Sequence, residues 1–236
     1  MRDGSSPHRR DRAGCGRIVG PVDAHLDTVL TAAVLGFMGV RLVGGVRHAR
    51  TGAGRALTTT IVRGVGWRHV WPVPLVLTGV LVVAAPLMSL PVLSWGWWSA
   101  MGGTGNPVFG SSTATAGGPL ELVIPLVFLA LLVPALPLFA HAEEVLFRRG
   151  AEGWSKRRRA LKVVQFGMVH ALIGIPIGAA LALSVGGAYF MAVYLRAVRG
   201  GLGAPGATIE SARAHAVYNA VIVVLVLVTL AACGLT

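Results

Sequence analysis

The stretch PLELVIPLVFLALLVPALPLFAHA, residues 119–142, decides the fold class of this chain. It contains a single charged residue, Glu121, and a helix of this length, rising about 1.5 Å per residue, covers the ~30 Å hydrocarbon core of a bilayer. The rest of the chain is similar, because 54% of its 236 residues are hydrophobic and only 13% are charged, about half of the usual ~25%. Mean hydropathy is +0.70. We therefore predict an all-α fold, a polytopic transmembrane helix bundle.

The composition excludes several other classes of protein. The apolar content is too high for an intrinsically disordered or collagen-like chain. Two cysteines near opposite ends, Cys15 and Cys233, exclude a disulfide scaffold and have no metal-binding or redox spacing. The net charge of +12 would suggest nucleic-acid binding in a soluble chain. Here the basic residues lie in short blocks between apolar runs, as in the loops of membrane proteins, so no nucleic-acid partner is expected.

The apolar stretches predict about six transmembrane helices. Lys162 and Arg196 both lie in basic segments on one side of the membrane, so the chain between them has to cross an even number of times. As one helix it would be ~50 Å long, and the segment Gly174-Ile175-Pro176-Ile177-Gly178 supplies a break, which has to be packed within protein or reach the outer surface. The predicted spans are 28–46, 72–93, 119–142, 163–175, 179–197 and 213–233.

Loop charges predict the orientation. Residues 47–71, 148–162 and 196–213 are rich in Lys and Arg and are expected inside. Residues 94–118 carry no charge and open with Trp95, Trp97 and Trp98, so they are expected outside. The first residues are also basic, so either the helix at 28–46 does not span or one basic region breaks the rule; we favour six helices with both termini outside. The predicted parts are a polar basic tail, 1–27, N-terminal transmembrane helices and loops, 28–118, and a C-terminal membrane domain, 119–236.

Ionisable residues inside a membrane are costly and commonly functional. The first such group follows the stretch 119–142 directly. Glu144 and Arg148 are four residues apart on one face of a helix and can form an ion pair. Glu143 points about 100° away and is left unpaired. A solvated charge cluster at a helix end is the alternative.

Two further polar groups occur near the inner ends of predicted helices. His170 lies ~12 Å below the basic boundary at Lys162, and Phe166 lies one turn before it on the same face. His215 and Asn219 are four residues apart, so both can donate a hydrogen bond to a single oxygen. Each could instead serve as a polar contact between helices. Because all of them are expected at one depth, they predict a polar pocket at the cytoplasmic ends of the C-terminal helices.

The order of these residues resembles a known family. Glu-Glu-x-x-x-Arg at 143–148, Phe-x-x-x-His at 166–170 and His-x-x-x-Asn at 215–219 are similar to the three motifs of the CAAX protease and bacteriocin-processing (CPBP, or Abi) family. These are intramembrane glutamic endopeptidases and include the type II CAAX prenyl endopeptidases. The resemblance covers about 119–233 and implies hydrolysis of a peptide bond in a membrane-associated peptide or protein, with no cofactor, at a site on the cytoplasmic side of a bacterial-type plasma membrane.

The resemblance also implies roles for individual residues. Glu143 would be the general base, and His170 would hold and polarise the same water. His215 and Asn219 would donate hydrogen bonds to the oxyanion of the tetrahedral intermediate. Supporting roles fall to Glu144, Arg148 and Phe166.

Other classes of function stay open on the sequence alone. A zinc-dependent version would use Glu143, His170 and His215 as ligands, although the chain lacks a His-Glu-x-x-His motif. A non-catalytic scaffold or immunity-type protein would keep the pocket for binding. A proton-coupled transporter is weaker, because no inverted repeat or pair of broken helices is visible.

Overall fold

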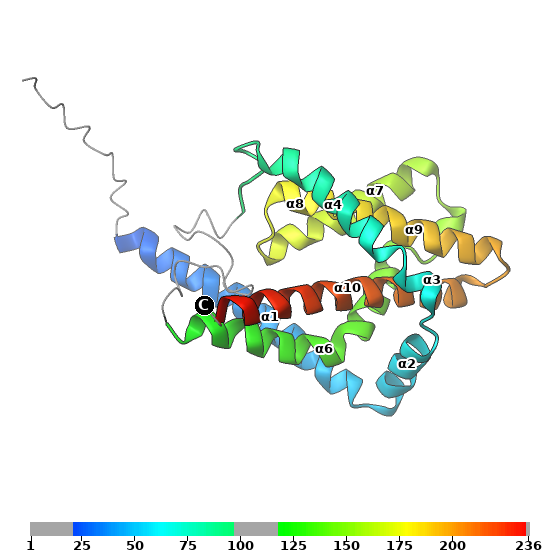
Figure 1. Ribbon diagram of the computed structural model, residues 1–236, viewed down its shortest axis with the longest axis horizontal. Coiled ribbons are helices and arrows are strands. Elements are labelled where there is room, and N and C mark those ends of the chain that lie inside the picture. Colours follow the sequence, from blue (N-terminus) through cyan, green and yellow to red (C-terminus); the bar gives the residue numbers. More distant parts are fainter. Residues whose placement is uncertain (1–20, 97–117, 235–236) are drawn as a thin grey trace, which may run out of the picture.

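The computed structural model describes residues 21–96 and 118–234 (Figure 1). Every regular element in these two ranges is a helix, which confirms the all-α class. In chain order the elements are α1 (Pro21–Ala49), α2 (Gly52–Arg63), α3 (Trp67–Val70), α4 (Val73–Met88), α6 (Leu120–Phe147), η2 (Ala151–Gly153), α7 (Lys156–Met168), η3 (Val169–Ile173), α8 (Ile177–Ala182), α9 (Ser184–Arg199) and α10 (Ala204–Gly234).

Within the described residues, four helical segments are long and apolar enough to cross a membrane, as an integral membrane protein requires. The expected number of about six is not confirmed. The predicted spans 28–46 and 163–175 are helical, within α1 and α7–η3, but neither belongs to the four. The four segments are Trp67–Met88, Leu120–Gly153, Ile177–Arg199 and Ala204–Thr229.

Two helices, α1 and α7, begin earlier in the sequence than the predicted spans 28–46 and 163–175. α7 begins at Lys156, because the Ser155 side chain accepts a hydrogen bond from the backbone N–H of Arg158 and caps the helix. Its first turns are therefore strongly basic, which lowers its hydropathy. α1 begins at Pro21, so the last residues of the predicted tail are helical. Residues 1–20 of that tail and residues 97–117 of the predicted outer loop, with Trp97 and Trp98, lie outside the described residues.

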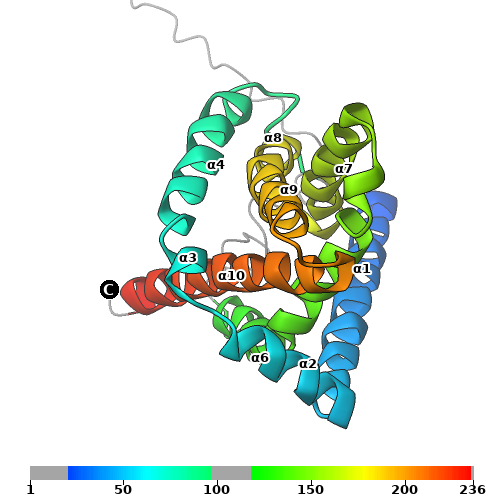
Figure 2. The same cartoon turned by 90° about the vertical axis from the view of Figure 1, so that its right-hand side faces the viewer.

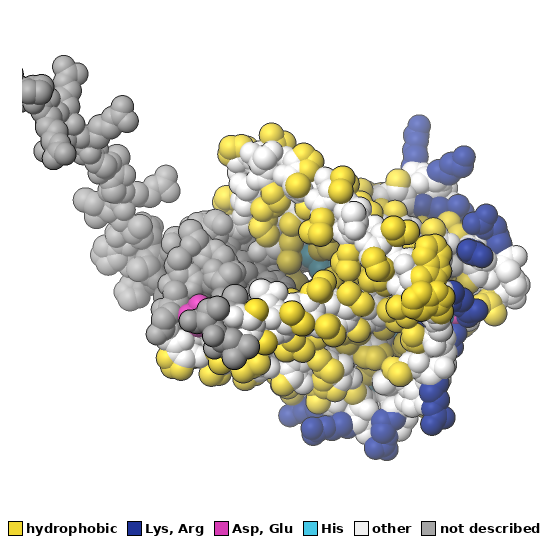
Figure 3. Space-filling model, viewed as in Figure 1, with side chains coloured by type: hydrophobic (Ala, Val, Ile, Leu, Met, Phe, Trp, Pro, Cys, Tyr) yellow, Lys and Arg dark blue, Asp and Glu magenta, His cyan; other side chains and the backbone are white. Residues whose placement is uncertain are grey.

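The basic segments gather at one end of the molecule. α4, α6, α9 and α10 run across Figure 1, and α2, α3 and the turn from α9 to α10 lie at its right-hand end. In the space-filling view, Lys and Arg lie at this end and along the lower right edge, while hydrophobic side chains cover the middle (Figure 3). We call this the basic end. Its position agrees with the loop charges, which put these segments on one side of the membrane.

The predicted break at Gly174–Gly178 is confirmed. Gly174 adopts a left-handed conformation, with φ of 92°, which a residue with a Cβ rarely adopts. The backbone N–H groups of Ile177 and Gly178 donate to the carbonyl oxygens of Trp95, at 3.0 Å, and Leu93, at 2.7 Å. The turn is therefore packed against the segment that follows α4, which satisfies its backbone polar groups.

α9 occupies the centre of the bundle. Seen nearly end on in Figure 2, it has α4 on one side and α7 on the other, and α10 crosses beneath it. α7 lies close to α8 and α9 because glycines occupy the points of contact. A Cβ at Gly187, on α9, would stand 2.8 Å from the Phe166 ring, and a Cβ at Gly167, on α7, would collide with the Ala180 carbonyl oxygen. The buried aromatic residues Phe147, Phe166 and Phe190 meet here and enclose a group of polar side chains.

Candidate functional site

Glu144 is the hub of the buried polar group. Its side chain is fully buried, and both carboxylate oxygens accept hydrogen bonds. Oε1 lies 2.8 Å from Nη1 of Arg148 and 2.9 Å from Nδ1 of His215, and Oε2 lies 2.5 Å from the Ser211 hydroxyl. The predicted ion pair between Glu144 and Arg148 is confirmed. A carboxylate with three donors has little capacity left to take a proton from water, so its role is to hold its neighbours in place.

The spacing of these residues on two helices explains the arrangement. Glu144 and Arg148 are one turn apart on α6, and Ser211 and His215 are one turn apart on α10. Because α6 and α10 pack against each other, the two pairs face one another. Sequence spacing predicts each of these two pairs, but it does not predict that the pair on α6 meets the pair on α10.

Arg148 is held by aromatic rings as well as by charge. The guanidinium is fully buried, and its carbon lies 4.1 Å from the centre of the Phe166 ring, which is a cation–π contact. The rings of Phe147 and Phe190 lie within 6 Å as well. Such a buried charge is tolerated only because Glu144 compensates it at 2.8 Å.

His215 connects the two glutamates. It is 1% exposed and stacks on Phe190, with ring centres 4.3 Å apart. The Glu144 carboxylate accepts, so the His215 Nδ1–H donates to it, and Nε2 is the nitrogen left for other partners. Nε2 lies 3.7 Å from Oε2 of Glu143. His215 therefore has one nitrogen fixed and one directed to the second glutamate.

The Glu143 side chain makes no hydrogen bond to a described residue and lies within ion-pair distance of His215. Its side chain is 33% exposed, and its Oε2 is buried without a hydrogen-bond partner among the described residues. Its nearest ionisable contact is the Nε2 of His215. The two adjacent glutamates thus differ: Glu144 is saturated with donors, and Glu143 is available to act on water.

Phe166 links the two histidines. Its ring meets the His170 ring edge to face at 5.3 Å and the His215 ring at 5.4 Å. His170, on η3, has its Nδ1 2.9 Å from the carbonyl oxygen of Phe166. Since a carbonyl only accepts, Nδ1–H donates, and the Nε2 of neutral His170 carries a free lone pair. His170 is therefore equipped to accept a hydrogen bond from water.

The position of Asn219 relative to the cluster follows from its place on α10. Asn219 lies one turn after His215 on α10 and is half-buried, and its side chain makes no hydrogen bond to a described residue. Its amide is thus available as a donor on the face that His215 occupies. The structure brings Glu143, Glu144, Arg148, Phe166, His170 and His215 into one cluster, and Asn219 joins it through α10 alone.

The zinc alternative has no preformed ligand set. In the part of the chain that the structure describes, no group of three or more His, Cys, Asp or Glu side chains is placed to hold a metal ion. Glu143 and His215 lie close to each other, whereas His170 reaches this pair through the Phe166 ring. A metal bound by all three would require these side chains to move.

Two features were missed by the sequence reasoning. The first is Ser211, one turn before His215, for which the spacing Ser-x-x-x-His-x-x-x-Asn on α10 was an available signal. The second is Glu210, on α10. Its Oε1 accepts a hydrogen bond from His69, at 3.0 Å, and its Oε2 accepts one from Arg213, at 2.9 Å. Oε1 also forms an ion pair with Nε of Arg68, at 2.9 Å. An acidic residue next to a basic turn, in a chain with only 9 Asp and Glu, was the signal there.

No protein-family model, no curated protein and no solved structure matches this chain. The chemistry of the cluster is therefore what remains to indicate a function. It combines two histidines whose Nδ1 atoms are engaged with one carboxylate and one side-chain amide that make no hydrogen bond to a described residue. Such a set can deprotonate water and stabilise a developing negative charge.

Proposed function

We propose that this chain is an intramembrane endopeptidase of the CPBP type. It hydrolyses a peptide bond in a membrane-associated peptide or protein with water activated by Glu143, and it uses no cofactor. One observation above all supports this: Oε2 of Glu143 has no hydrogen-bond partner among the described residues and lies 3.7 Å from Nε2 of a histidine whose other nitrogen is fixed by Glu144. In this proposal the basic end of the molecule faces the cytoplasm.

In the proposed reaction, Glu143 accepts a proton from water while the oxygen of that water adds to the scissile carbonyl carbon. His170 orients the water, because its Nε2 accepts a hydrogen bond from the second hydrogen. The tetrahedral intermediate then collapses. Protonated Glu143 gives its proton to the amide nitrogen as the C–N bond breaks, which leaves a carboxylic acid and an amine.

The oxyanion of the intermediate is stabilised from α10. His215 in its imidazolium form donates from Nε2, with its Nδ1–H held by Glu144, and Asn219 donates from its amide. Ser211 and Arg148 act through Glu144, since they fix the carboxylate that positions His215. These are positioning residues and touch no reacting atom.

Access from the bilayer is compatible with the surface of the molecule. Figure 3 shows a hollow between the helices of the upper half and α10, and a histidine side chain is visible at its bottom. The surrounding surface is hydrophobic. A substrate held in the membrane can therefore approach without first leaving it.

The test compares wild type with Glu143→Gln in a bacterial host. Mass spectrometry of protein N-termini in the host membranes identifies cleavages, and a cleaved segment is then assayed with purified enzyme in liposomes. Glu152→Gln is the matched control, because Glu152 is exposed, accepts from the Tyr194 hydroxyl, and keeps an acceptor oxygen as Gln. We expect new N-termini with wild type and Glu152→Gln and none with Glu143→Gln.

Two outcomes would contradict the proposal. If no cleavage depends on Glu143, the pocket belongs to a non-catalytic scaffold or immunity-type protein. If chelation with EDTA or phenanthroline abolishes activity and zinc restores it, Glu143, His170 and His215 are metal ligands and the base assignment is wrong.

A further inference from the structure

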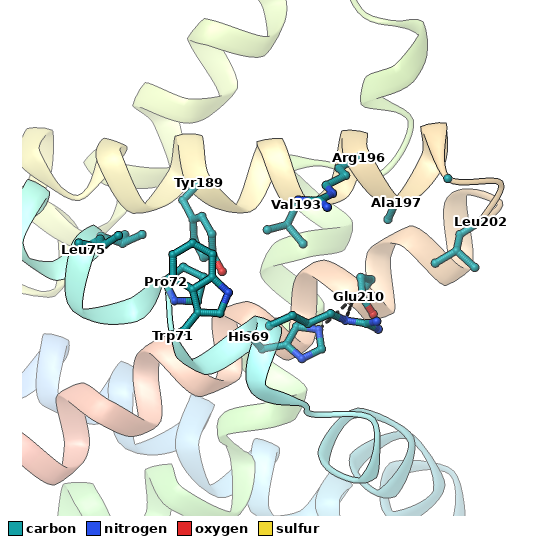
Figure 4. A pocket seen from close by; sticks show the side chains of 13 residues that line it. His69, Trp71, Pro72, Leu75, Tyr189, Val193, Arg196, Ala197, Leu202 and Glu210 are labelled. Atoms are coloured by element: carbon teal, nitrogen blue, oxygen red, sulfur yellow. Dashed lines mark hydrogen bonds and ion pairs between the residues drawn. The ribbon is translucent and has the colours of Figure 1, made fainter.

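A cavity lies at the basic end, and its lining residues are distinct from those of the Glu143 cluster. Its volume is about 730 Å³, and it is bounded by the Trp67–Met88 segment, α9 and the start of α10. Figure 4 shows Tyr189, Val193 and Arg196 of α9 on one side, with His69 and Glu210 on the other. This volume falls in the range of ligand pockets, which is roughly 300–1,000 Å³.

The polar part of the cavity carries unused positive charge. Arg68 forms an ion pair with Glu210, with its Nε 2.9 Å from Oε1, and its two terminal amino groups make no hydrogen bond to a described residue. Arg196, one of the cavity's lining residues, makes none either and is exposed. Glu210, the acidic residue of the lining, is already paired with Arg68, His69 and Arg213. The free donors that line the cavity therefore select an anion.

The other part of the cavity is apolar and open to the membrane. Leu75 is 66% exposed and Trp71 is 52% exposed. Both lie in a segment that is able to span a bilayer, where exposed apolar side chains contact lipid. Val76 and Val193 complete this wall. Leu75 lies at the end of the cavity away from Arg196 and Glu210 (Figure 4). Polarity thus changes along the cavity, from guanidinium groups near the basic end to hydrocarbon toward the middle of the membrane.

We infer that this cavity binds one molecule of an anionic phospholipid. The phosphate accepts hydrogen bonds from Arg68 and Arg196, and an acyl chain lies along Leu75 and Val76. Basic pockets between transmembrane helices on the cytoplasmic side suit anionic headgroups, and the neighbouring Trp67 and Trp71 are the side chains expected at headgroup level. A zwitterionic headgroup brings its own cation and gains less from two guanidinium groups. This site does not depend on the proposed protease activity.

Native mass spectrometry of the full chain in detergent tests the inference. The probes are phosphatidylglycerol, phosphatidylcholine and soluble glycerol phosphate. The variant is Arg68→Gln/Arg196→Gln, and the matched control is Arg63→Gln/Arg157→Gln, which removes two exposed arginines of the basic end outside the cavity. We expect one phosphatidylglycerol per chain, bound about tenfold more weakly by the variant and unchanged in the control.

A third variant separates the headgroup from the chain. Leu75→Trp keeps both arginines and fills the apolar end, so it should weaken phosphatidylglycerol binding severalfold. Tight binding of glycerol phosphate would show a site for a free phosphate instead. Equal retention of phosphatidylcholine, equal loss in the control, or an adduct with the mass of a peptide or a second chain in place of a lipid would each overturn the inference.

Discussion

At the scale of single residues, the feature with the largest energetic consequence is the pair Glu144–Arg148. Both side chains are fully buried, and removal of either leaves a charge in an apolar site. We predict that Arg148→Ala destabilises the protein by ~3–5 kcal/mol. Thermal unfolding in detergent measures this, with Arg157→Ala, an exposed arginine of α7, as the control that should change stability by less than ~0.5 kcal/mol.

The double variant Glu144→Gln/Arg148→Ala sharpens this prediction. It removes both charges and leaves the same cavity as the single Arg148→Ala variant, so its stability should be the higher of the two. If the single and double variants melt at the same temperature, the loss comes from packing against Phe166 and not from an uncompensated carboxylate.

Asn219 should act on turnover without acting on stability. Its side chain makes no hydrogen bond to a described residue, so Asn219→Ala removes no side-chain hydrogen bond of the folded state. If it donates to the oxyanion, its loss should lower kcat by ~10²-fold while KM and Tm change little. Tyr218→Phe is the neighbouring control. The buried Tyr218 hydroxyl has no hydrogen-bond partner among the described residues, so its removal should leave kcat and Tm near wild type. An unchanged kcat would remove Asn219 from the mechanism.

At the scale of elements, the position of α7 depends on glycine. A Cβ at Gly167 would collide with the Ala180 carbonyl oxygen and with Ser184, so Gly167→Ala should push α7 away from α8 and α9 at a cost of ~1–3 kcal/mol. The shift would also displace Phe166 and His170, so activity should fall with stability. Gly44→Ala is the control. Gly44 is exposed within α1, and a Cβ added there has no described neighbour within 4 Å, so alanine should be neutral or stabilising. A stable, active Gly167→Ala variant would contradict this packing.

At the scale of the whole molecule, the positions of the basic segments predict the topology. In a chain with Cys15 and Cys233 replaced, Ser155→Cys, an exposed position directly before the basic first turn of α7, should react with an impermeant thiol reagent from the cytoplasmic side. Ser89→Cys, which follows α4 and is exposed, should react from the outside. The whole-molecule arrangement would be wrong if both cysteines were labelled from the same side.

The sequence by itself determined the features that depend on local chemistry. Apolar content sets the membrane class, Gly174 and Pro176 set a break, and a spacing of four on α6 sets the ion pair of Glu144 with Arg148. Each follows from hydropathy, allowed φ or the helical repeat, which neighbouring residues decide among themselves. The number of crossings did not follow in the same way: 28–46 and 163–175 are helical, but the four candidate segments among the described residues do not include them.

Only the tertiary structure decided which side chains meet across helices. Ser211 and His215 reach Glu144 from 67 and 71 residues away, Phe166 touches both histidines, and Arg68 forms an ion pair with Glu210 at the edge of the cavity. These contacts depend on the rotation and crossing of α6, α7 and α10 about one another. That geometry is fixed by glycines such as Gly167 and Gly187 and by the close packing of aromatic rings, which no local periodicity encodes.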